Sequence, residues 1–185
     1  ITQINSNPVP FDSNYILISQ TEQLKHDIVH IVTQIFQRGE IEVLIGTKSL
    51  LGEGWDAPAI NSLILASFVG SFVLSNQMRG RAIRTQNGNS DKTGNIWHLV
   101  CIDPTSPTGG DDFDLLKRRF RSFVGVSFKE EPGIENGIGR LNLPENIHHK
   151  EEAEKKNLEM FTHAGDRESL KQRWKEALAT GVNLV

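Results

Sequence analysis

The segment IEVLIGTKSLLGEGWDAP, residues 41–58, decides the predicted fold because an apolar run changes there into a glycine-rich loop. Residues 41–45 are mostly apolar and predict a strand. Gly46, Gly52 and Gly54 follow, and Asp56 stands before Ala-Pro. Glycines at the carboxyl end of a strand let the backbone approach a ligand closely, and exposed amides there suit phosphate. The segment therefore predicts a strand that ends in a ligand-binding loop.

Strands and helices alternate on both sides of this segment. Three signals predict a helix before the segment. Ser19 and Glu22 have capping-box spacing at its start, apolar residues repeat at helical intervals, and Gly39 stands where a C-terminal cap belongs. Residues 71–84 predict a second helix, and three further strands are predicted at 15–18, 60–67 and 95–102. This order is typical of an α/β fold with a mostly parallel sheet and flanking helices. Ligands of such sheets bind at the carboxyl ends of the strands.

The composition changes after Pro104. The stretch DPTSPTGGDD, residues 103–112, is rich in Pro, Gly and Asp and predicts a linker. Helices are predicted for 112–124, 148–162 and 166–179. We therefore expect two domains, residues 1–105 and a mainly helical extension, residues 106–185.

Composition excludes several classes of protein. The 185 residues carry a net charge of −3, which argues against bulk nucleic-acid binding by a uniformly basic surface. Cys101 is the single cysteine, so a disulfide framework is excluded. No apolar run approaches the roughly 20 residues of a membrane span. We expect a cytoplasmic location, and because the chain opens on Ile1 we expect it to be a piece of a longer protein.

The stretch SNQMRGRAIRT, residues 75–85, holds three arginines. At roughly 100° per helical residue, Arg81 lies about 40° from Gln77 and Arg84 about 20° on the other side, whereas Arg79 points away. Gly80 costs about 1 kcal/mol against Ala inside a helix, so the close approach of a backbone or a phosphate would explain it. Arginine forks suit anionic oxygens. Gln77, Arg81 and Arg84 therefore predict a polyphosphate clamp.

Three other motifs favour an ordinary structural interpretation. HDIVH, residues 26–30, has the histidine spacing of a zinc-peptidase helix but holds Asp where the general base is Glu, and both histidines fall off the apolar stripe. GTKS, residues 46–49, lacks the Gly-Lys pair of a phosphate loop. DDFD, residues 111–114, follows a Gly-Gly linker, and acidic residues are favoured at a helix N-terminus in any case.

Together the two glycine- and arginine-containing segments resemble the second RecA-like lobe of superfamily 2 helicases and translocases. VLIGTKSLLGEGWDAP is similar to their motif V, and QMRGRAIR is similar to motif VI, Gln-x-x-Gly-Arg-x-x-Arg. Bacterial excision-repair helicases and restriction-type translocases carry the most similar runs. The resemblance covers about residues 14–103 and implies a partial RecA-like, P-loop NTPase-type sheet.

The resemblance also implies a function, which is ATP hydrolysis with Mg²⁺ between two lobes, coupled to movement along nucleic acid, either DNA or RNA. Arg84 would be the arginine finger, and Arg81 would assist at the phosphates. Gly54, Asp56 and Gln77 would border the nucleotide. Thr47 and Lys48 would face the nucleic-acid backbone.

The chain departs from this family in several places. Met78 and Lys48 stand where many relatives have Arg and Asp, and the chain has no phosphate-loop signature. ATP and Mg²⁺ would be held mainly by an N-terminal RecA-like lobe of the same protein, so this chain alone is expected to be inactive. The alternative is a non-catalytic nucleic-acid-binding or protein-docking module, for which the basic residues between Lys117 and Arg121 are the motivation, although a solvated helix face explains them as well.

Overall fold

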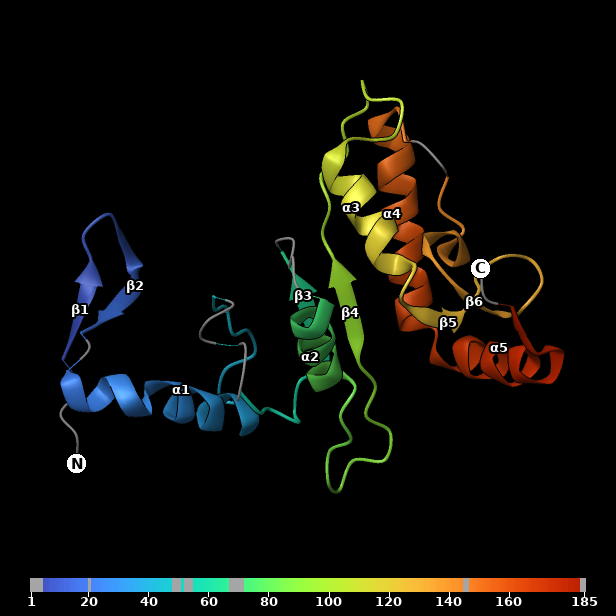
Figure 1. Ribbon diagram of the computed structural model, residues 1–185. Helices are drawn as coiled ribbons and strands as arrows, with labels where there is room; N and C mark the ends of the chain where they lie inside the picture. The colour runs from blue at the N-terminus through green and yellow to red at the C-terminus, as the bar shows by residue number, and fades with distance from the viewer. Residues whose placement is uncertain are drawn as a thin grey trace. The chain divides into compact units, whose positions relative to one another are not determined.

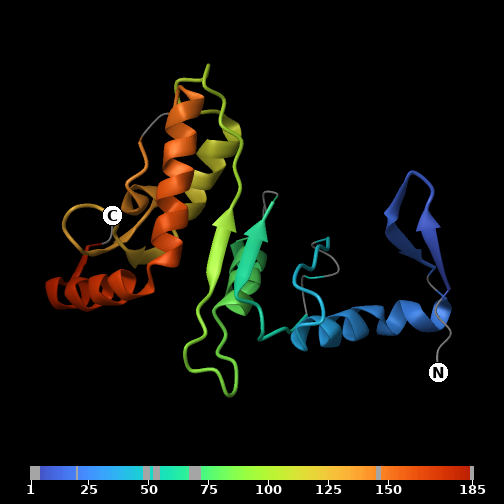
Figure 2. The same ribbon diagram turned by 180° about the vertical axis from the view of Figure 1, so that it is seen from behind.

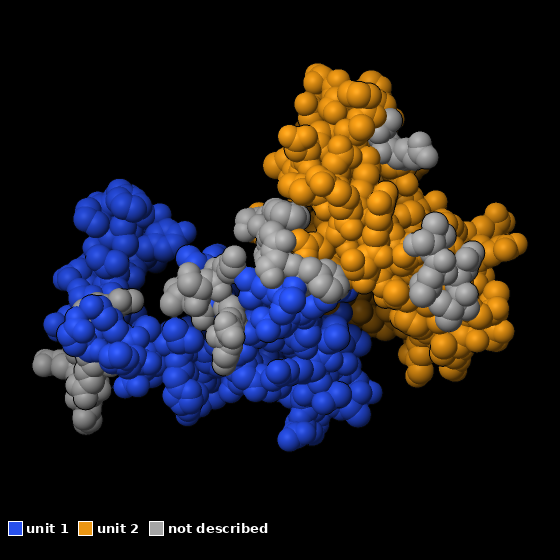
Figure 3. Space-filling model, in the orientation of Figure 1, with its two compact units in different colours: residues 1–63, 73–94 blue, residues 64–72, 95–185 orange. Residues whose placement is uncertain are grey.

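The computed structural model describes residues 5–19, 21–47, 51, 55–66, 72–144 and 147–183. The chain divides into two compact units (Figure 3). Unit 1 comprises residues 1–63 and 73–94, and unit 2 comprises residues 64–72 and 95–185. The boundary expected at residue 105 stays a prediction, and the two units are described one after the other.

Unit 1 contains a hairpin and two helices (Figure 1). Strands β1 (Ser6–Val9) and β2 (Asp12–Ile18) pair antiparallel. Helix α1 (Glu22–Gln37) begins after Thr21, whose side chain accepts a hydrogen bond from the Leu24 amide at 3.2 Å. The N-terminal cap is thus Thr21 and not Ser19, whereas Gly39 follows the C-cap with φ +75°, as expected. Helix α2 spans Phe72–Ala82.

The buried side chains of unit 1 lie on both helices and in the loop at residues 55–60. Leu24 and Thr33 are buried on α1, Ala57 and Ile60 in the loop, and Ser75, Arg81 and Ala82 on α2. The loop at residues 55–60 is therefore part of the core, although it has no regular secondary structure.

Unit 2 includes β4 (Asn95–His98), which pairs with β3 (Ser62–Leu65), and the division between the units after residue 63 falls within β3. The remaining elements of unit 2 are α3 (Asp111–Phe120), β5 (Val124–Val126), β6 (Ile134–Asn136), the 3₁₀ helix η1 (Ile138–Leu141), α4 (Lys150–Gly165), α5 (Arg167–Thr180) and β7 (Val182–Asn183), which Figure 2 shows from behind. Strand β6 pairs antiparallel with β5 and parallel with β7.

Aromatic and aliphatic side chains fill the core of unit 2. Phe113 and Phe120 of α3 are buried, and the His98 ring packs against Phe120 and Phe123 with centroids 5.3 and 5.9 Å apart. Val126, Ile134 and Ala177 form a second cluster, on which Leu170 packs. This packing joins α3 to β4 and α5 to the sheet of β5, β6 and β7.

The expected mostly parallel sheet is not found among the described residues. Residues 15–18 belong to an antiparallel hairpin, and residues 41–45 form no strand. A parallel sheet buries both faces, but Val43 and Ile45 are 75% and 89% exposed, and most of β2 is exposed as well. The chain is a mixed α/β protein with small sheets and C-terminal helices.

The helix predictions are largely confirmed, because the signals that predict a helix lie within one segment of the chain. The helices expected at 71–84, 112–124, 148–162 and 166–179 correspond to α2, α3, α4 and α5, with bounds shifted by a few residues. Within the described ranges, none of the helices has the length and apolar character needed to cross a membrane.

Phe113→Ala should lower the free energy of unfolding by about 3–5 kcal/mol, because it leaves a cavity in the core of unit 2, where Phe113 is 1% exposed. Phe11→Ala is the matched control, because Phe11 is 91% exposed. Urea unfolding followed by circular dichroism measures both variants. Equal effects of the two substitutions would contradict the described core.

Candidate functional site

The end of the glycine-rich segment is fastened to helix α1 within unit 1. The Trp55 indole Nε1–H donates to the hydroxyl oxygen of Thr33 at 2.7 Å. The side-chain amide of Gln37 donates to the backbone carbonyl of Asp56 at 3.4 Å, and Ala57 is fully buried. The position of Asp56 is therefore set by two contacts with α1 and by the buried residue that follows it.

Two arginines from the C-terminal end of α2 contact the same segment. Arg81 Nη1 donates to the Leu51 carbonyl at 2.8 Å, and its guanidinium lies 5.9 Å from the Trp55 ring centroid. Arg84 Nη1 forms an ion pair with Asp56 Oδ1. The structure thus brings Asp56, Arg81 and Arg84 together across 28 residues of sequence.

Burial distinguishes the two arginines. Arg81 is only 7% exposed, and its pKa is lowered. Loss of solvent is the main cause and repulsion from Arg84 the second, while attraction to the Asp56 carboxylate partly offsets them. The guanidinium stays charged, because its ordinary pKa lies far above neutral pH. Arg84 and Asp56 are each about half exposed, so their ion pair contributes no more than about 1 kcal/mol. With two cations and one carboxylate, the cluster carries a net positive charge suited to an anion.

The chain that follows α2 fixes the position of Arg84. Lys92 Nζ donates to the carbonyls of Ala82 and Arg84, at 3.2 and 2.5 Å. These carbonyls are at the helix end, where a cation is favourable. Gly94 packs so closely that an added Cβ would lie 2.4 Å from the Ala82 carbonyl oxygen. Arg84 itself lies beyond the last helical residue, so this turn and not the helix determines where it points.

The other predicted site residues are less constrained. Gln77 is exposed on α2, and Thr47 is exposed, with its carbonyl accepting from the Leu51 amide at 3.0 Å. Lys48 and Gly54 lie outside the described residues. The functional roles of all these residues stay predictions.

Arg79 and Gly80 differ from the two clustered arginines. Arg79 is partly buried and donates to Asn76 Oδ1 at 3.3 Å, and burial lowers its pKa. A Cβ added at Gly80 would have no described atom within 4 Å. Steric exclusion by the described residues therefore does not account for this glycine.

The sequence analysis missed Thr33, Trp55 and Lys92. Thr33 is a polar residue among the apolar positions of α1, and this was the available signal for a buried contact. Trp55, a large aromatic residue beside Asp56 in a glycine-rich loop, was a second signal. Lys92 gave none, because it lies in a polar turn whose proximity to α2 depends on the fold.

The motifs interpreted as structural have ordinary contacts. His26 and His30 are exposed on α1, and His30 Nε2 lies 2.8 Å from the Gln34 side-chain amide. Asp112 Oδ2 accepts from the Cys101 amide at 2.7 Å. The carboxylates of DDFD thus include one that fastens the preceding chain to α3.

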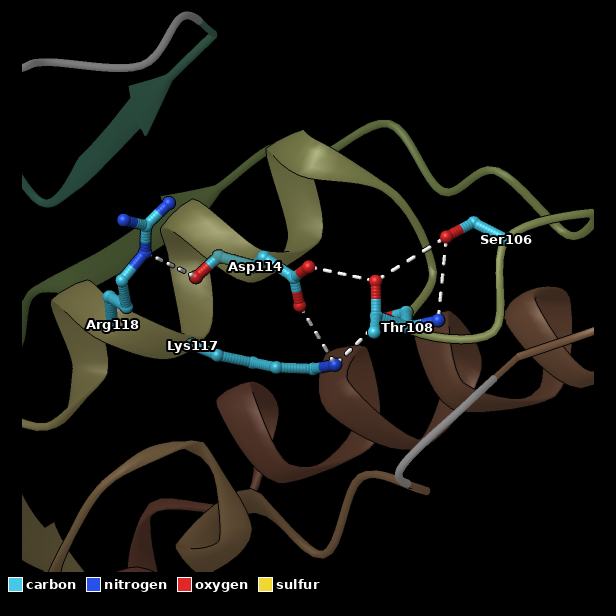
Figure 4. Close-up of polar contacts among 5 residues, drawn as sticks. All are labelled: Ser106, Thr108, Asp114, Lys117 and Arg118. Atoms are coloured by element: carbon cyan, nitrogen blue, oxygen red, sulfur yellow. Dashed lines mark hydrogen bonds and ion pairs between the residues drawn. The ribbon is translucent and has the colours of Figure 1, made fainter.

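Asp114 connects the 103–110 loop to α3 (Figure 4). Its carboxylate accepts from Thr108 Oγ1 at 2.7 Å and from Lys117 Nζ at 3.3 Å, and Lys117 also donates to the Thr108 carbonyl at 2.7 Å. The Thr108 hydrogen bond is the main reason why the pKa of Asp114 is lowered. Lys117, one of the basic run, therefore has a structural role, while Arg118 and Arg121 are exposed.

No protein-family model, curated protein or solved structure matches the chain. The function proposed for it accordingly depends on the two motifs and on the contacts between them.

Proposed function

We propose that the chain is the second RecA-like lobe, with a helical extension, of an ATP-dependent superfamily 2 helicase or translocase acting on DNA. The observation that carries this proposal is the convergence of Arg81 and Arg84 on the segment from Leu51 to Asp56. The two segments that resemble motifs V and VI are separate in sequence, and their arginines and carboxylate meet in unit 1. A nucleotide site built from both segments requires this proximity of their side chains.

Arg84 has the properties of an arginine finger. Its side chain is half exposed, and its weak ion pair with a single carboxylate can exchange for a more highly charged phosphate. A planar guanidinium fork also matches the oxygens of a phosphoryl group. In this proposal Arg84 stabilises the negative charge that develops on the γ-phosphate of ATP during hydrolysis.

Arg81 and Asp56 complete the cluster. Arg81 is held by the Leu51 carbonyl and lies close to Trp55, so its charge is fixed in place near Arg84. We assign to Arg81 a supporting electrostatic role at the phosphates, and to Asp56 a place near the ribose with Gly54 and Gln77. Thr47 and Lys48 would contact the nucleic-acid backbone. Mg²⁺ and most contacts to ATP belong to the N-terminal lobe.

Exposed apolar side chains in unit 1 support the existence of a further lobe. Tyr15, Ile16 and Leu17 of β2 are more than half exposed, as are Val43 and Ile45. Exposed apolar surface of this kind marks contacts with other protein surfaces. In the complete protein these residues would pack against additional RecA-like structure.

Arg84→Ala in the complete polypeptide should lower the kcat of DNA-stimulated ATP hydrolysis by about 10³-fold or more, because it removes charge stabilisation in the transition state. Arg38→Ala is the control, since Arg38 is an exposed arginine at the end of α1 in the same unit. Steady-state ATPase assays with and without DNA measure both variants. An active wild type that is unaffected by Arg84→Ala would refute the finger assignment, and an inactive wild type that binds DNA would favour the non-catalytic module.

Gly80→Ala should separate stability from activity. It should raise the free energy of unfolding by up to about 1 kcal/mol, because alanine is the better helix former and its Cβ meets no described atom. The ATPase rate should nevertheless fall, by about tenfold or more, if a phosphate must approach the backbone there.

Gly165→Ala is the matched control for this substitution. Gly165 is also helical, in α4, and has open space around its Cα. It should give a similar gain in stability with an unchanged ATPase rate. If Gly80→Ala likewise left the ATPase rate unchanged, the phosphate explanation of Gly80 would be wrong.

A further inference from the structure

The Thr33 hydroxyl group both donates and accepts a hydrogen bond inside unit 1. It donates to the Val29 carbonyl one helical turn earlier, at 2.5 Å, and accepts from the Trp55 indole at 2.7 Å. Because the single hydroxyl hydrogen goes to Val29, the oxygen lone pairs remain available to the indole N–H. Thr33 is only 7% exposed, so water has little access to replace either bond.

The Trp55 side chain connects this hydroxyl to the candidate site. Its ring lies 5.9 Å from the Arg81 guanidinium, and the next residue, Asp56, pairs with Arg84. Gln37, one turn beyond Thr33 on α1, donates to the Asp56 carbonyl. Helix α1 thereby holds Trp55, whose ring lies beside Arg81, and Asp56, which pairs with Arg84, although α1 itself contributes no predicted site residue.

We propose that Thr33 is a positioning residue for the arginine pair, acting through Trp55. The proposal rests on the function proposed above, and it assigns Thr33 no contact with nucleotide. Loss of the hydroxyl leaves the indole N–H without its acceptor, so the Trp55 ring can leave its place beside Arg81. A small displacement of a group that acts on the transition state lowers the rate strongly.

Substitutions at Thr33 and Trp55 can remove the hydrogen-bond acceptor or the donor separately. Thr33→Val keeps the shape and removes the acceptor, whereas Thr33→Ser keeps the acceptor. Trp55→Phe keeps an aromatic ring and removes the donor. Thr162 is the matched control, because its hydroxyl makes the same type of bond, to the Leu158 carbonyl at 2.9 Å, at an exposed position of α4 in unit 2.

The experiment is DNA-stimulated ATP hydrolysis by the complete polypeptide. Thr33→Val should lower kcat by about tenfold to a hundredfold and leave the KM for ATP unchanged, because the arginines act mainly on the transition state. Thr33→Ser and Thr162→Val should retain the wild-type kcat. The double variant Thr33→Val/Trp55→Phe should be no slower than the slower single variant, since both changes remove one hydrogen bond.

Two kinds of result would overturn the inference. A wild type without ATPase activity would reject the proposed function and the positioning role together. If the wild type is active, three results would each refute the positioning role alone. These are an unchanged kcat of Thr33→Val, an equal loss of kcat in Thr33→Ser, and additive effects of Thr33→Val and Trp55→Phe on kcat in the double variant. Thermal unfolding of each variant identifies a variant that has lost its fold, and in that case the Thr33→Ser and Trp55→Phe variants still decide between these outcomes.

Discussion

The hydrogen bond from the Trp55 indole to the Thr33 hydroxyl is the contact on which the candidate site depends. Residues 55–57 belong to no strand or helix, so their position comes from side-chain contacts. Trp55 and the Asp56 carbonyl are fastened to α1, and Ala57 is buried behind them. Only because this loop is fixed can two arginines from another helix meet it in a defined arrangement.

Arg81, Arg84 and Asp56 together carry a net positive charge, which attracts an anion. Asp56 neutralises one cation at most, and it does so through an exposed and therefore weak ion pair. Arg81 is buried beside it, and its pKa is lowered mainly by loss of solvent. A buried charge that is fixed by a carbonyl and an aromatic ring needs little reorganisation when an anion binds. The proposed phosphate site thus follows from burial as much as from residue type.

Local sequence signals predicted the helices better than they predicted the sheet. The signals that predict a helix lie within one segment, and α2 to α5 lie close to their expected positions. A strand needs a partner that the segment does not contain, and residues 41–45 have none among the described residues, where Val43 and Ile45 remain exposed. The expected parallel sheet failed for that reason.

The contacts of the site also depend on residues that are distant in the sequence. The proximity of Asp56 to the two arginines was implied by a motif resemblance, and the structure brings the three residues together. The Thr33–Trp55 bond joins residues 22 positions apart and belongs to no motif, so no sequence pattern specified it. The cap at Thr21 was also missed, because Ser19 and Glu22 have capping-box spacing, whereas the third residue after Thr21 is Leu24.

The most direct measurement is an experimental structure of the complete polypeptide with Mg²⁺ and a non-hydrolysable ATP analogue. We expect the Arg84 guanidinium to leave Asp56 and to lie about 3 Å from a γ-phosphate oxygen, with Arg81 beside it and the Trp55–Thr33 bond intact. An analogue bound in the same protein while Arg84 still pairs with Asp56, away from the phosphates, would contradict this expectation.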